Sequence, residues 1–429
     1  MPSALVRSQI KLILQELKGA GAHPANWDED DNDVDYLYRR NNMLCRPADV
    51  DRVVRELRDL LEPRGEQSAE QEQQRPETVI RVHGVIDGVV RIEYSSGKDT
   101  PTVPQLLDEL DRRVGPGVAR PDHILHICPH ACPATEPEEV GVAEPFPAVA
   151  DDQKCSGENV FVSIVDTGLI AEATAQHSWL AGVNGTIETT FDPSTGRILP
   201  YAGHGTFGAG TLRCVAPKAS VFVESANLGA GGAQYETEVV QRLTETLSKS
   251  PDIIVLTLAT DTRGSLPLMT FDALYESTIR HIKGLVMLCP ADNEGTNALR
   301  WPAAYPWVVS VGALSANWQQ RATFSNYGGW VDVYAPGEGL VNAFATGEYE
   351  CFYPPNEGVL RQFKGIAKWS GTSYSTPLVA GLIAARMSVT GENGQQAAES
   401  LLQFARSQAI PGVGAILLPG QACFDVEGC

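Results

Sequence analysis

The stretch Val160-Phe161-Val162-Ser163-Ile164-Val165-Asp166-Thr167-Gly168 decides the fold class of this chain. It begins as a continuous apolar run rich in β-branched residues, which is typical of a strand buried on both faces of a parallel sheet. Asp166 follows at the carboxyl end of that strand, where open α/β sheets place their functional sites. The sequence therefore predicts an α/β fold with a carboxylate at the functional edge of its sheet.

Further apolar runs alternate with helical patterns and extend this sheet along the chain. The predicted strands are Val221–Val223, Ile253–Leu258, Leu285–Cys289 and Val308–Val311. Apolar residues at helical spacing lie between them, from Tyr235 to Leu247 and from Phe271 to Ile282. Alternation of this kind predicts a doubly wound parallel sheet covered by helices on both faces.

Two polar side chains lie in segments that could reach the same edge of the sheet as Asp166. His204 stands among small residues in Gly203–Gly210, which allow another backbone to approach closely before a helix begins. Asn293 lies in Pro290–Gly295, directly after an apolar strand, where it can present its amide to the same pocket.

The run Gly371-Thr372-Ser373-Tyr374-Ser375-Thr376-Pro377 opens an apolar helix that continues through Ala385. A serine between a tight turn and a helix start has an exposed hydroxyl, and the backbone N–H groups there can hold an oxyanion. A Ser/Thr-rich segment is also an ordinary helix cap, so this run alone does not establish a nucleophile.

Taken together, Asp166, His204, Asn293 and Ser373 supply the parts that acyl transfer requires. Serine needs a base to accept its proton, and the base needs a buried carboxylate to fix its tautomer. The order Asp, His, Ser along the chain is the subtilisin order and differs from that of chymotrypsin.

These segments resemble the subtilisin-like serine proteases (subtilases, peptidase family S8) from about residue 157 to about residue 389. Three more stretches continue the resemblance in order: Trp301–Ala313, Ala322–Gly328 and Val333–Gly337. The resemblance implies that Asp166 orients the imidazole, His204 is the general base, Ser373 attacks, and Asn293 donates to the oxyanion.

The same resemblance implies a set of substrate-binding residues: Thr257, Leu258, Ala259, Ala291, Asp292, Glu294 and Arg300. Ala259 replaces the family's usual glycine on the strand that pairs with substrate. Arg300 stands where relatives tend to carry a small residue, so it could favour an acidic residue before the cleaved bond. Two alternatives remain open: Arg300 pairs with Glu294, or it turns to solvent.

Three regions are expected along the chain. Residues 1–133 read as a small α+β domain, with a charged excursion at 66–77 that cannot bury a core. Residues 134–156 read as an acidic, Pro-rich, exposed linker, and residues 157–429 as the subtilisin-like part. In subtilases a preceding α+β domain is usually a prodomain, so residues 1–133 are interpreted as an intramolecular inhibitor or, alternatively, a partner-binding domain.

No cofactor is expected. The loop that builds a tight calcium site in many subtilases is missing, because Gly210–Cys214 passes directly to Val215–Lys218. A cluster of soft ligands in the first domain could bind zinc, although alternate residues on a strand face opposite sides. The cluster comprises His123, His126, Cys128, His130 and Cys132.

Composition limits the partners and the location. The chain has 429 residues, 43% hydrophobic content and a formal net charge of -20, which disfavours nucleic acid and anionic membranes. The amphipathic pattern from Val6 to Lys18 is not a signal peptide, so a cytoplasmic location is expected unless a leader has been removed. Nine cysteines suggest reduced thiols by default, with Cys423 and Cys429 able to pair.

The sequence thus predicts a serine endopeptidase that acts on peptides or proteins and is made as a self-inhibited, self-processed precursor. Two alternatives remain. A catalytically silent binding module could keep the fold, and a transpeptidase or macrocyclase could use the same triad. The last would need an element that excludes water from the acyl-enzyme.

Overall fold

The computed structural model describes residues 4–27, 34–62, 78–95, 100–127, 136–141, 150 and 155–426. Its centre is a seven-stranded sheet in the order β14-β13-β12-β10-β6-β8-β7, in which every pair is parallel. The strands are β6 (Phe161–Asp166), β7 (Asn184–Gly185), β8 (Ser220–Ser225), β10 (Ile253–Leu256), β12 (Val286–Pro290), β13 (Val308–Leu314) and β14 (Val333–Pro336). The predicted doubly wound α/β fold is confirmed.

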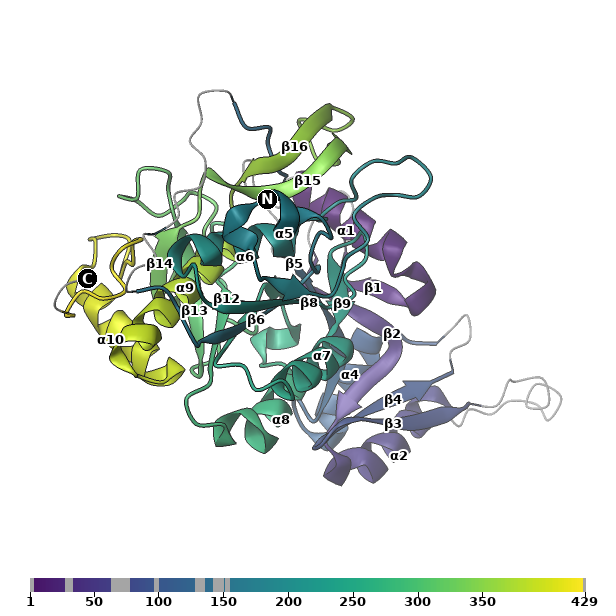
Figure 1. Ribbon diagram of the computed structural model, residues 1–429. Helices are drawn as coiled ribbons and strands as arrows, with labels where there is room; N and C mark the ends of the chain where they lie inside the picture. Colours follow the sequence, from purple (N-terminus) through teal and green to yellow (C-terminus); the bar gives the residue numbers. More distant parts are fainter. Residues whose placement is uncertain are drawn as a thin grey trace, which may run out of the picture.

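Successive residues of the central strands face opposite layers, as strand geometry requires. Ile253 and Val255 belong to one buried cluster, whereas Ile254 and Leu256 belong to the other. The first cluster includes residues of α6 (His204–Val215), α9 (Thr372–Thr390) and α10 (Gly394–Ser407); the second includes residues of α7 (Glu236–Leu247) and α8 (Met269–Ser277). Helices therefore cover both faces of the sheet (Figure 1). A one-turn helix, α5 (Ala173–Gln176), follows β6.

The N-terminal part forms a second sheet with a core of its own. Its elements are α1 (Ala4–Glu16), β1 (Ala22–Ala25), β2 (Tyr36–Cys45), α2 (Val50–Leu61), β3 (Ile80–Ile86), β4 (Val89–Tyr94), α4 (Val103–Val114) and β5 (Ala119–Ile127). Helices α2 and α4 pack their apolar faces against β2 and β4. The predicted α+β organisation is present, although strand β2 was not anticipated.

Strand β5 joins the two parts, because it pairs with strands from both. It is antiparallel to β2 on one side of the N-terminal sheet. Its other partners are β9 (Ala233–Tyr235) and β11 (Leu258–Ala259), also antiparallel, and both belong to the subtilisin-like part. The N-terminal sheet thus runs directly into the edge of the second part (Figure 1).

An antiparallel hairpin, β15 (Leu340–Glu350) and β16 (Leu360–Trp369), forms a separate two-stranded sheet. Sequence patterns did not predict it. The stretch Glu136–Glu139, expected to be an exposed linker, lies against this hairpin, and Glu136 is buried with 5% of its surface exposed. The prediction of an exposed linker is therefore wrong for this stretch. The Glu136 carboxylate can be buried because it accepts hydrogen bonds from the hairpin.

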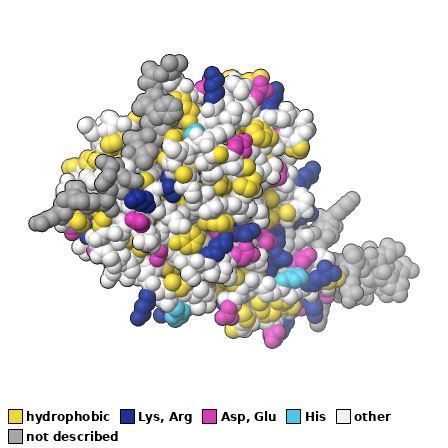
Figure 2. Space-filling view, in the orientation of Figure 1, with side chains coloured by type: hydrophobic (Ala, Val, Ile, Leu, Met, Phe, Trp, Pro, Cys, Tyr) yellow, Lys and Arg dark blue, Asp and Glu magenta, His cyan; other side chains and the backbone are white. Residues whose placement is uncertain are grey.

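Cys155 and Cys423 form a disulfide, so the expectation of reduced thiols is wrong for this pair. The suggested pairing of Cys423 with Cys429 is wrong as well, because Cys423 is bonded to Cys155. Four other described cysteines form no disulfide: Cys45, Cys214, Cys289 and Cys351. Among the described residues, none of the helices combines the length and hydropathy that a membrane-spanning helix requires. Acidic and basic side chains are interspersed on the face drawn in Figure 2, without a large patch of either sign.

Candidate active site

Asp166 lies at the carboxyl end of β6, which is an inner strand of the sheet between β10 and β8. Its side chain is fully buried. The Asp166 carboxylate accepts hydrogen bonds from the Thr167 N–H at 2.6 Å and the Thr257 hydroxyl at 2.5 Å. Burial acts to raise the pKa of this carboxyl, but the His204 charge and these hydrogen bonds outweigh it and hold the pKa below its ordinary value. Asp166 is therefore ionised at neutral pH.

His204 is the first residue of α6, and its ring reaches back to Asp166. Nδ1 lies 2.9 Å from one carboxylate oxygen and 2.8 Å from the other. The approach depends on Gly205, since a Cβ there would lie 2.6 Å from the Gly168 carbonyl oxygen. A carboxylate on Nδ1 leaves Nε2 as the nitrogen that can accept a proton.

Ser373 occupies the first turn of α9, as the sequence predicts, and the next residue contacts His204. The Tyr374 ring centroid lies 5.1 Å from that of His204. The Ser373 hydroxyl is buried and has no hydrogen-bond partner among the described residues. The start of α9 thus contacts His204 through Tyr374, and no hydrogen bond joins Ser373 to His204; catalytic hydrogen bonds often form only once substrate binds.

Asn293 follows β12 and is held in one orientation by Thr372. Its Oδ1 accepts from the Thr372 N–H at 2.8 Å and from the Thr372 hydroxyl at 2.9 Å. Because both bonds fix the oxygen, the amide NH2 is directed away from Thr372. Asp292, just before it, has a φ of 79°, an unusual backbone conformation of the kind that concentrates at functional sites.

The predicted substrate-binding residues fall into two groups. Leu258 and Ala259 form β11, and each pairs with a β5 residue: Leu258 with Ile127 and Ala259 with His126. The hydroxyl of Thr257 donates to Asp166, and its predicted contact with substrate stays a prediction.

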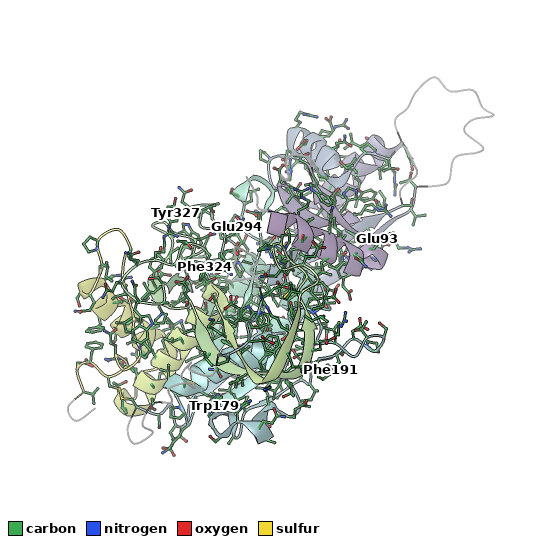
Figure 3. The ribbon with its side chains drawn as sticks, turned by 90° about the horizontal axis from the view of Figure 1, so that it is seen from above. Glu93, Trp179, Phe191, Glu294, Phe324 and Tyr327 are labelled. Atoms are coloured by element: carbon green, nitrogen blue, oxygen red, sulfur yellow. A yellow bond between two sulfur atoms is a disulfide. The ribbon has the colours of Figure 1, made fainter. Side chains whose placement is uncertain are left out.

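The second group surrounds Arg300, whose side chain is only 4% exposed. Its guanidinium forms ion pairs with Asp292 at 2.7 Å and also with Glu294 and Asp261. Figure 3 shows Glu294 in the same region as Phe324 and Tyr327, and the Gly295 N–H donates to the Phe324 carbonyl at 2.6 Å. Of the alternatives left open for Arg300, the ion pair with Glu294 is present. Three carboxylates on one guanidinium leave no positive charge in excess for an acidic substrate residue. Ala291 lies at the end of β12, where its N–H donates to Val311.

Sequence reasoning missed three residues at this site. Asp261 joins Arg300 from an irregular segment that carries no motif. The Trp369 ring lies edge-on to His204 with 5.5 Å between the centroids. Glu188 Oε1 accepts from the N–H of Gly203 at 2.6 Å, and Gly203 is the residue directly before the helix that starts with His204. None of the three has a signal in the sequence, because their roles depend on tertiary contacts.

The zinc interpretation of the histidine cluster is not supported where the structure describes it. His123 is buried, with Nδ1 3.1 Å from Glu236 and Nε2 accepting from the Arg263 N–H at 3.2 Å. His126 Nδ1 lies 3.2 Å from the Ile127 carbonyl, and burial lowers the pKa of this histidine to about 4. No group of three metal-ligating side chains occurs in the described part of the chain, and Cys128, His130 and Cys132 lie outside it.

Glu188 provides a pH-dependent test of this arrangement. Burial raises its pKa from 4.5 to about 8, so the native state holds a proton that the unfolded chain releases near pH 4.5. The free energy of unfolding should therefore fall as the pH rises from about 4.5 to about 8. Glu188→Gln has no carboxyl to ionise, so it should not lose stability in this way. Its melting temperature should therefore rise relative to that of wild type as the pH increases from about 4.5 to about 8.

The measurement is a series of thermal melts of both proteins between pH 4 and pH 9. Glu357→Gln, at an exposed glutamate, is the matched control. A constant difference between Glu188→Gln and wild type over the whole pH series would contradict the assignment of a neutral Glu188.

The family model described as "Subtilase family" matches residues 157–406. The chain belongs to the subtilase family. Subtilisin NAT of Bacillus subtilis subsp. natto is 29% identical to this subtilase over 279 residues, or 61% of the chain and 63% of the relative. An intracellular serine protease of Paenibacillus polymyxa is 29% identical over 244 residues, covering 53% of the chain and 66% of the relative.

This subtilase therefore spans somewhat less than two thirds of the length of the first of these relatives. Among solved structures, fervidolysin from Fervidobacterium pennivorans superposes with a TM-score of 0.56 at 18% identity, over 91% of this chain and 61% of that one. The latter is described as a keratinolytic enzyme related to subtilisin. This likeness supports the fold of the subtilase, and it extends beyond the residues that the family model matches.

Proposed function

We propose that this subtilase is a serine endopeptidase that cleaves peptide bonds through an acyl-enzyme. The observation that carries the proposal is the placement of His204 Nδ1 on the buried, ionised Asp166. A histidine held in this way presents Nε2 as a base, which is what a serine nucleophile requires.

In the proposed reaction, His204 Nε2 takes the proton of the Ser373 hydroxyl as Oγ bonds to the substrate carbonyl carbon. The negative charge on the carbonyl oxygen is held by the Asn293 amide and by backbone N–H groups at the start of α9. Collapse of this intermediate breaks the C–N bond, and His204 returns the proton to the leaving amine. Water then repeats the sequence on the acyl-enzyme and regenerates Ser373.

We further propose that residues 1–133 act as an intramolecular inhibitor. Strand β5 lies between β9 and β11, the position that an extended substrate would take beside Leu258 and Ala259. Leu125 and Ile127 of β5 belong to the buried apolar cluster that contains Leu258. From α1, the Gln9 amide donates to the Ile127 carbonyl at 3.1 Å, a buried hydrogen bond at the end of the strand.

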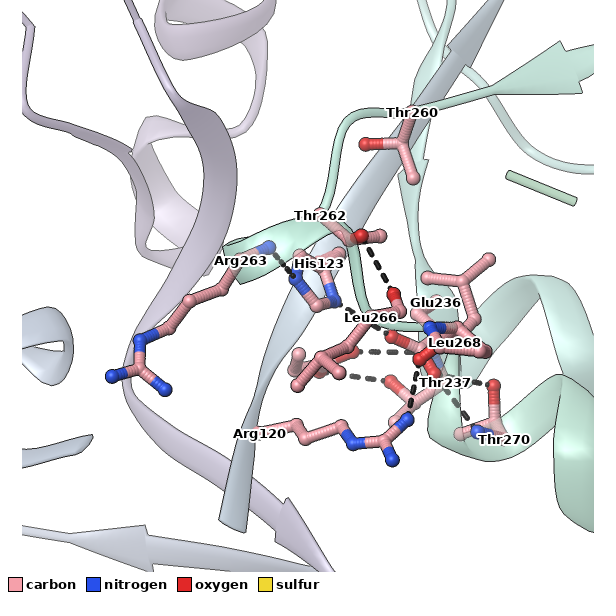
Figure 4. A network of polar contacts seen from close by, with 12 residues as sticks. Arg120, His123, Glu236, Thr237, Thr260, Thr262, Arg263, Leu266, Leu268 and Thr270 are labelled. Atoms are coloured by element: carbon pink, nitrogen blue, oxygen red, sulfur yellow. Dashed lines mark hydrogen bonds and ion pairs between the residues drawn. The ribbon is translucent and has the colours of Figure 1, made fainter. Parts of the chain in front are cut away.

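Buried polar contacts also hold this domain in place. His123 of β5 lies between Glu236 and Arg263, and Glu236 accepts from both the N–H and the hydroxyl of Thr270 at 2.9 Å (Figure 4). Asp122 accepts from the N–H of Thr237 at 3.2 Å. A satisfied buried network of this kind favours one docked arrangement, which suits an inhibitor that stays bound until it is cut.

The experiment compares wild type with Ser373→Ala in two assays. A fluorophosphonate probe should label wild type only, because labelling requires an activated serine. Intact mass should show wild type cut between the two parts and Ser373→Ala at full length. Absence of labelling would favour the silent binding module, whereas labelling without self-cutting would refute self-processing but leave the endopeptidase proposal standing.

The transpeptidase alternative is distinguished by products. With a peptide substrate and an added amine nucleophile, an endopeptidase yields mainly the free acid, whereas a transpeptidase yields the amide.

We also propose that the enzyme requires no cofactor and no structural calcium in the shortened segment after α6. A cytoplasmic location remains a prediction, and the Cys155–Cys423 disulfide counts against it, because disulfides persist mainly in oxidising compartments.

A further inference from the structure

The β15–β16 hairpin holds a buried carboxylate, that of Glu136, which the proposed reaction does not use. Glu136 is 5% exposed, and its Oε1 accepts from the Phe352 N–H at 2.6 Å and from the Tyr349 hydroxyl at 3.1 Å. Burial raises the pKa of Glu136, although the two hydrogen bonds and the charge of Arg361 oppose the rise. The donors on the hairpin thus offset part of the cost of taking this carboxylate out of water.

The contacts continue along the chain as a short strand addition. Glu138 and Lys368 exchange two backbone hydrogen bonds, of 2.7 and 2.9 Å, and the Lys368 ammonium lies 3.1 Å from the Glu138 carboxylate. Glu139 accepts from the Gln362 N–H at 2.5 Å, and Arg361 donates to the Pro137 carbonyl at 2.5 Å. Backbone pairing supplies affinity in this mode of recognition, and the side-chain contacts supply specificity.

The donors to Glu136 belong to the hairpin, and packing in the main apolar cluster holds Tyr349 independently of Glu136. The Tyr349 and Phe363 rings are 6.2 Å apart and both are buried in the main cluster. The negative charges on β15 are already countered, because Arg197 pairs with Glu348 and Glu350. In a chain of net charge -20, β16 nevertheless presents Arg361, Lys364 and Lys368. If Glu136 leaves, the Phe352 N–H and the Tyr349 hydroxyl lose their partner, which favours a replacement carboxylate.

The hairpin also contacts one of the proposed catalytic residues. The hairpin ends at Trp369, whose ring contacts His204. Strand β5 precedes Glu136 in the chain and pairs with β11, so the segment on the hairpin comes after the β11-paired segment in chain direction. For a substrate in the same direction, the hairpin would hold residues beyond the cleaved bond, in the leaving part.

We propose that the hairpin is a binding site for an extended acidic peptide segment, occupied by Glu136–Glu139 in the intact chain and by the leaving part of a substrate once that segment is released. This inference rests on the proposed function and specifies its substrate class. Substrates with glutamates spaced as in Glu-Pro-Glu-Glu, downstream of the cleaved bond, should be preferred.

The test uses wild-type enzyme after any self-processing and two peptides that are identical up to the cleaved bond. One carries Glu-Pro-Glu-Glu at staggered distances downstream, and the other carries Gln-Pro-Gln-Gln. The acidic peptide should have a kcat/KM roughly tenfold higher, the size expected for a charge-assisted hydrogen bond. The preference should disappear in Arg361→Ala/Lys368→Ala and persist in the control Arg280→Ala, at an exposed arginine elsewhere.

A short substrate that ends just after the cleaved bond separates this inference from the proposed function. It cannot reach the hairpin, so all three proteins should cleave it equally. Cleavage of the short substrate with equal turnover of the two long peptides would overturn the hairpin site alone. Failure to cleave any substrate, with no fluorophosphonate labelling, would overturn the endopeptidase itself. Lys368→Arg should retain the acidic preference, which guards against a hairpin that merely fails to fold.

Discussion

His204→Ala should lower kcat for peptide hydrolysis by about 10⁶-fold, a magnitude known from subtilisin and carried over to this relative. The reason is that His204 is the base to which the proposed mechanism assigns the Ser373 proton. The Ser373 hydroxyl has no hydrogen-bond partner among the described residues, and the only imidazole held on the buried Asp166 in that part of the chain is His204.

The decisive comparison is the double variant His204→Ala/Ser373→Ala. If the two side chains act as one unit, the double variant should be no slower than either single variant, because removing one partner already abolishes the function of the other. All three variants should lack the proposed self-processing, so they should share the same inhibited state and can be compared directly. Losses that multiply in the double variant would mean that His204 and Ser373 act independently, contrary to the proposed mechanism.

Arg300→Met should lower the free energy of unfolding by about 3–5 kcal/mol, the usual cost of removing one partner from a buried ion pair. The guanidinium neutralises Asp292, Glu294 and Asp261, and Asp292 is 1% exposed. Without Arg300, a buried carboxylate remains beside two others. Urea unfolding of wild type and variant, analysed for midpoint and slope, measures the loss.

Two controls show whether charge is the cause. Arg280→Met removes an exposed arginine and should change stability little. Adding Glu294→Gln to Arg300→Met should recover part of the loss, because one of the stranded carboxylates disappears. A loss that Glu294→Gln does not relieve would point to packing of the arginine stem instead. A variant as stable as wild type would show that the cluster carries no net energy.

The proposed catalytic residues could be located in the sequence because each lies where an element starts or ends. Asp166 closes a buried strand, Asn293 follows another, and His204 and Ser373 open helices, so hydrophobic periodicity locates all four. Parallel strands bring their carboxyl ends to one edge, which is why distant segments could be expected to meet there.

The rest depends on contacts that local sequence does not encode. Residues 340–369 contain the longest hairpin of the subtilisin-like part, yet their apolar residues do not alternate cleanly, and a bulge between Ala343 and Thr346 breaks the register. The role of Glu136 depends on donors more than 200 residues away. The hydrogen bond from the Thr257 hydroxyl to Asp166 was not expected either, because it depends on the packing of β6 against β10.

The bond between Cys155 and Cys423 joins positions 268 residues apart in the sequence, and the segment between them includes the strand of Asp166 and the helices of His204 and Ser373. A protease at high concentration attacks its own loops. Any single nick inside this ring leaves two pieces that remain covalently tied, so they can stay assembled around the catalytic groups. A cut before Cys155, in contrast, severs the covalent link to the N-terminal fragment and leaves it held by non-covalent contacts alone. Under the proposed self-processing, the position of this crosslink therefore separates an activating cut from an autolytic one.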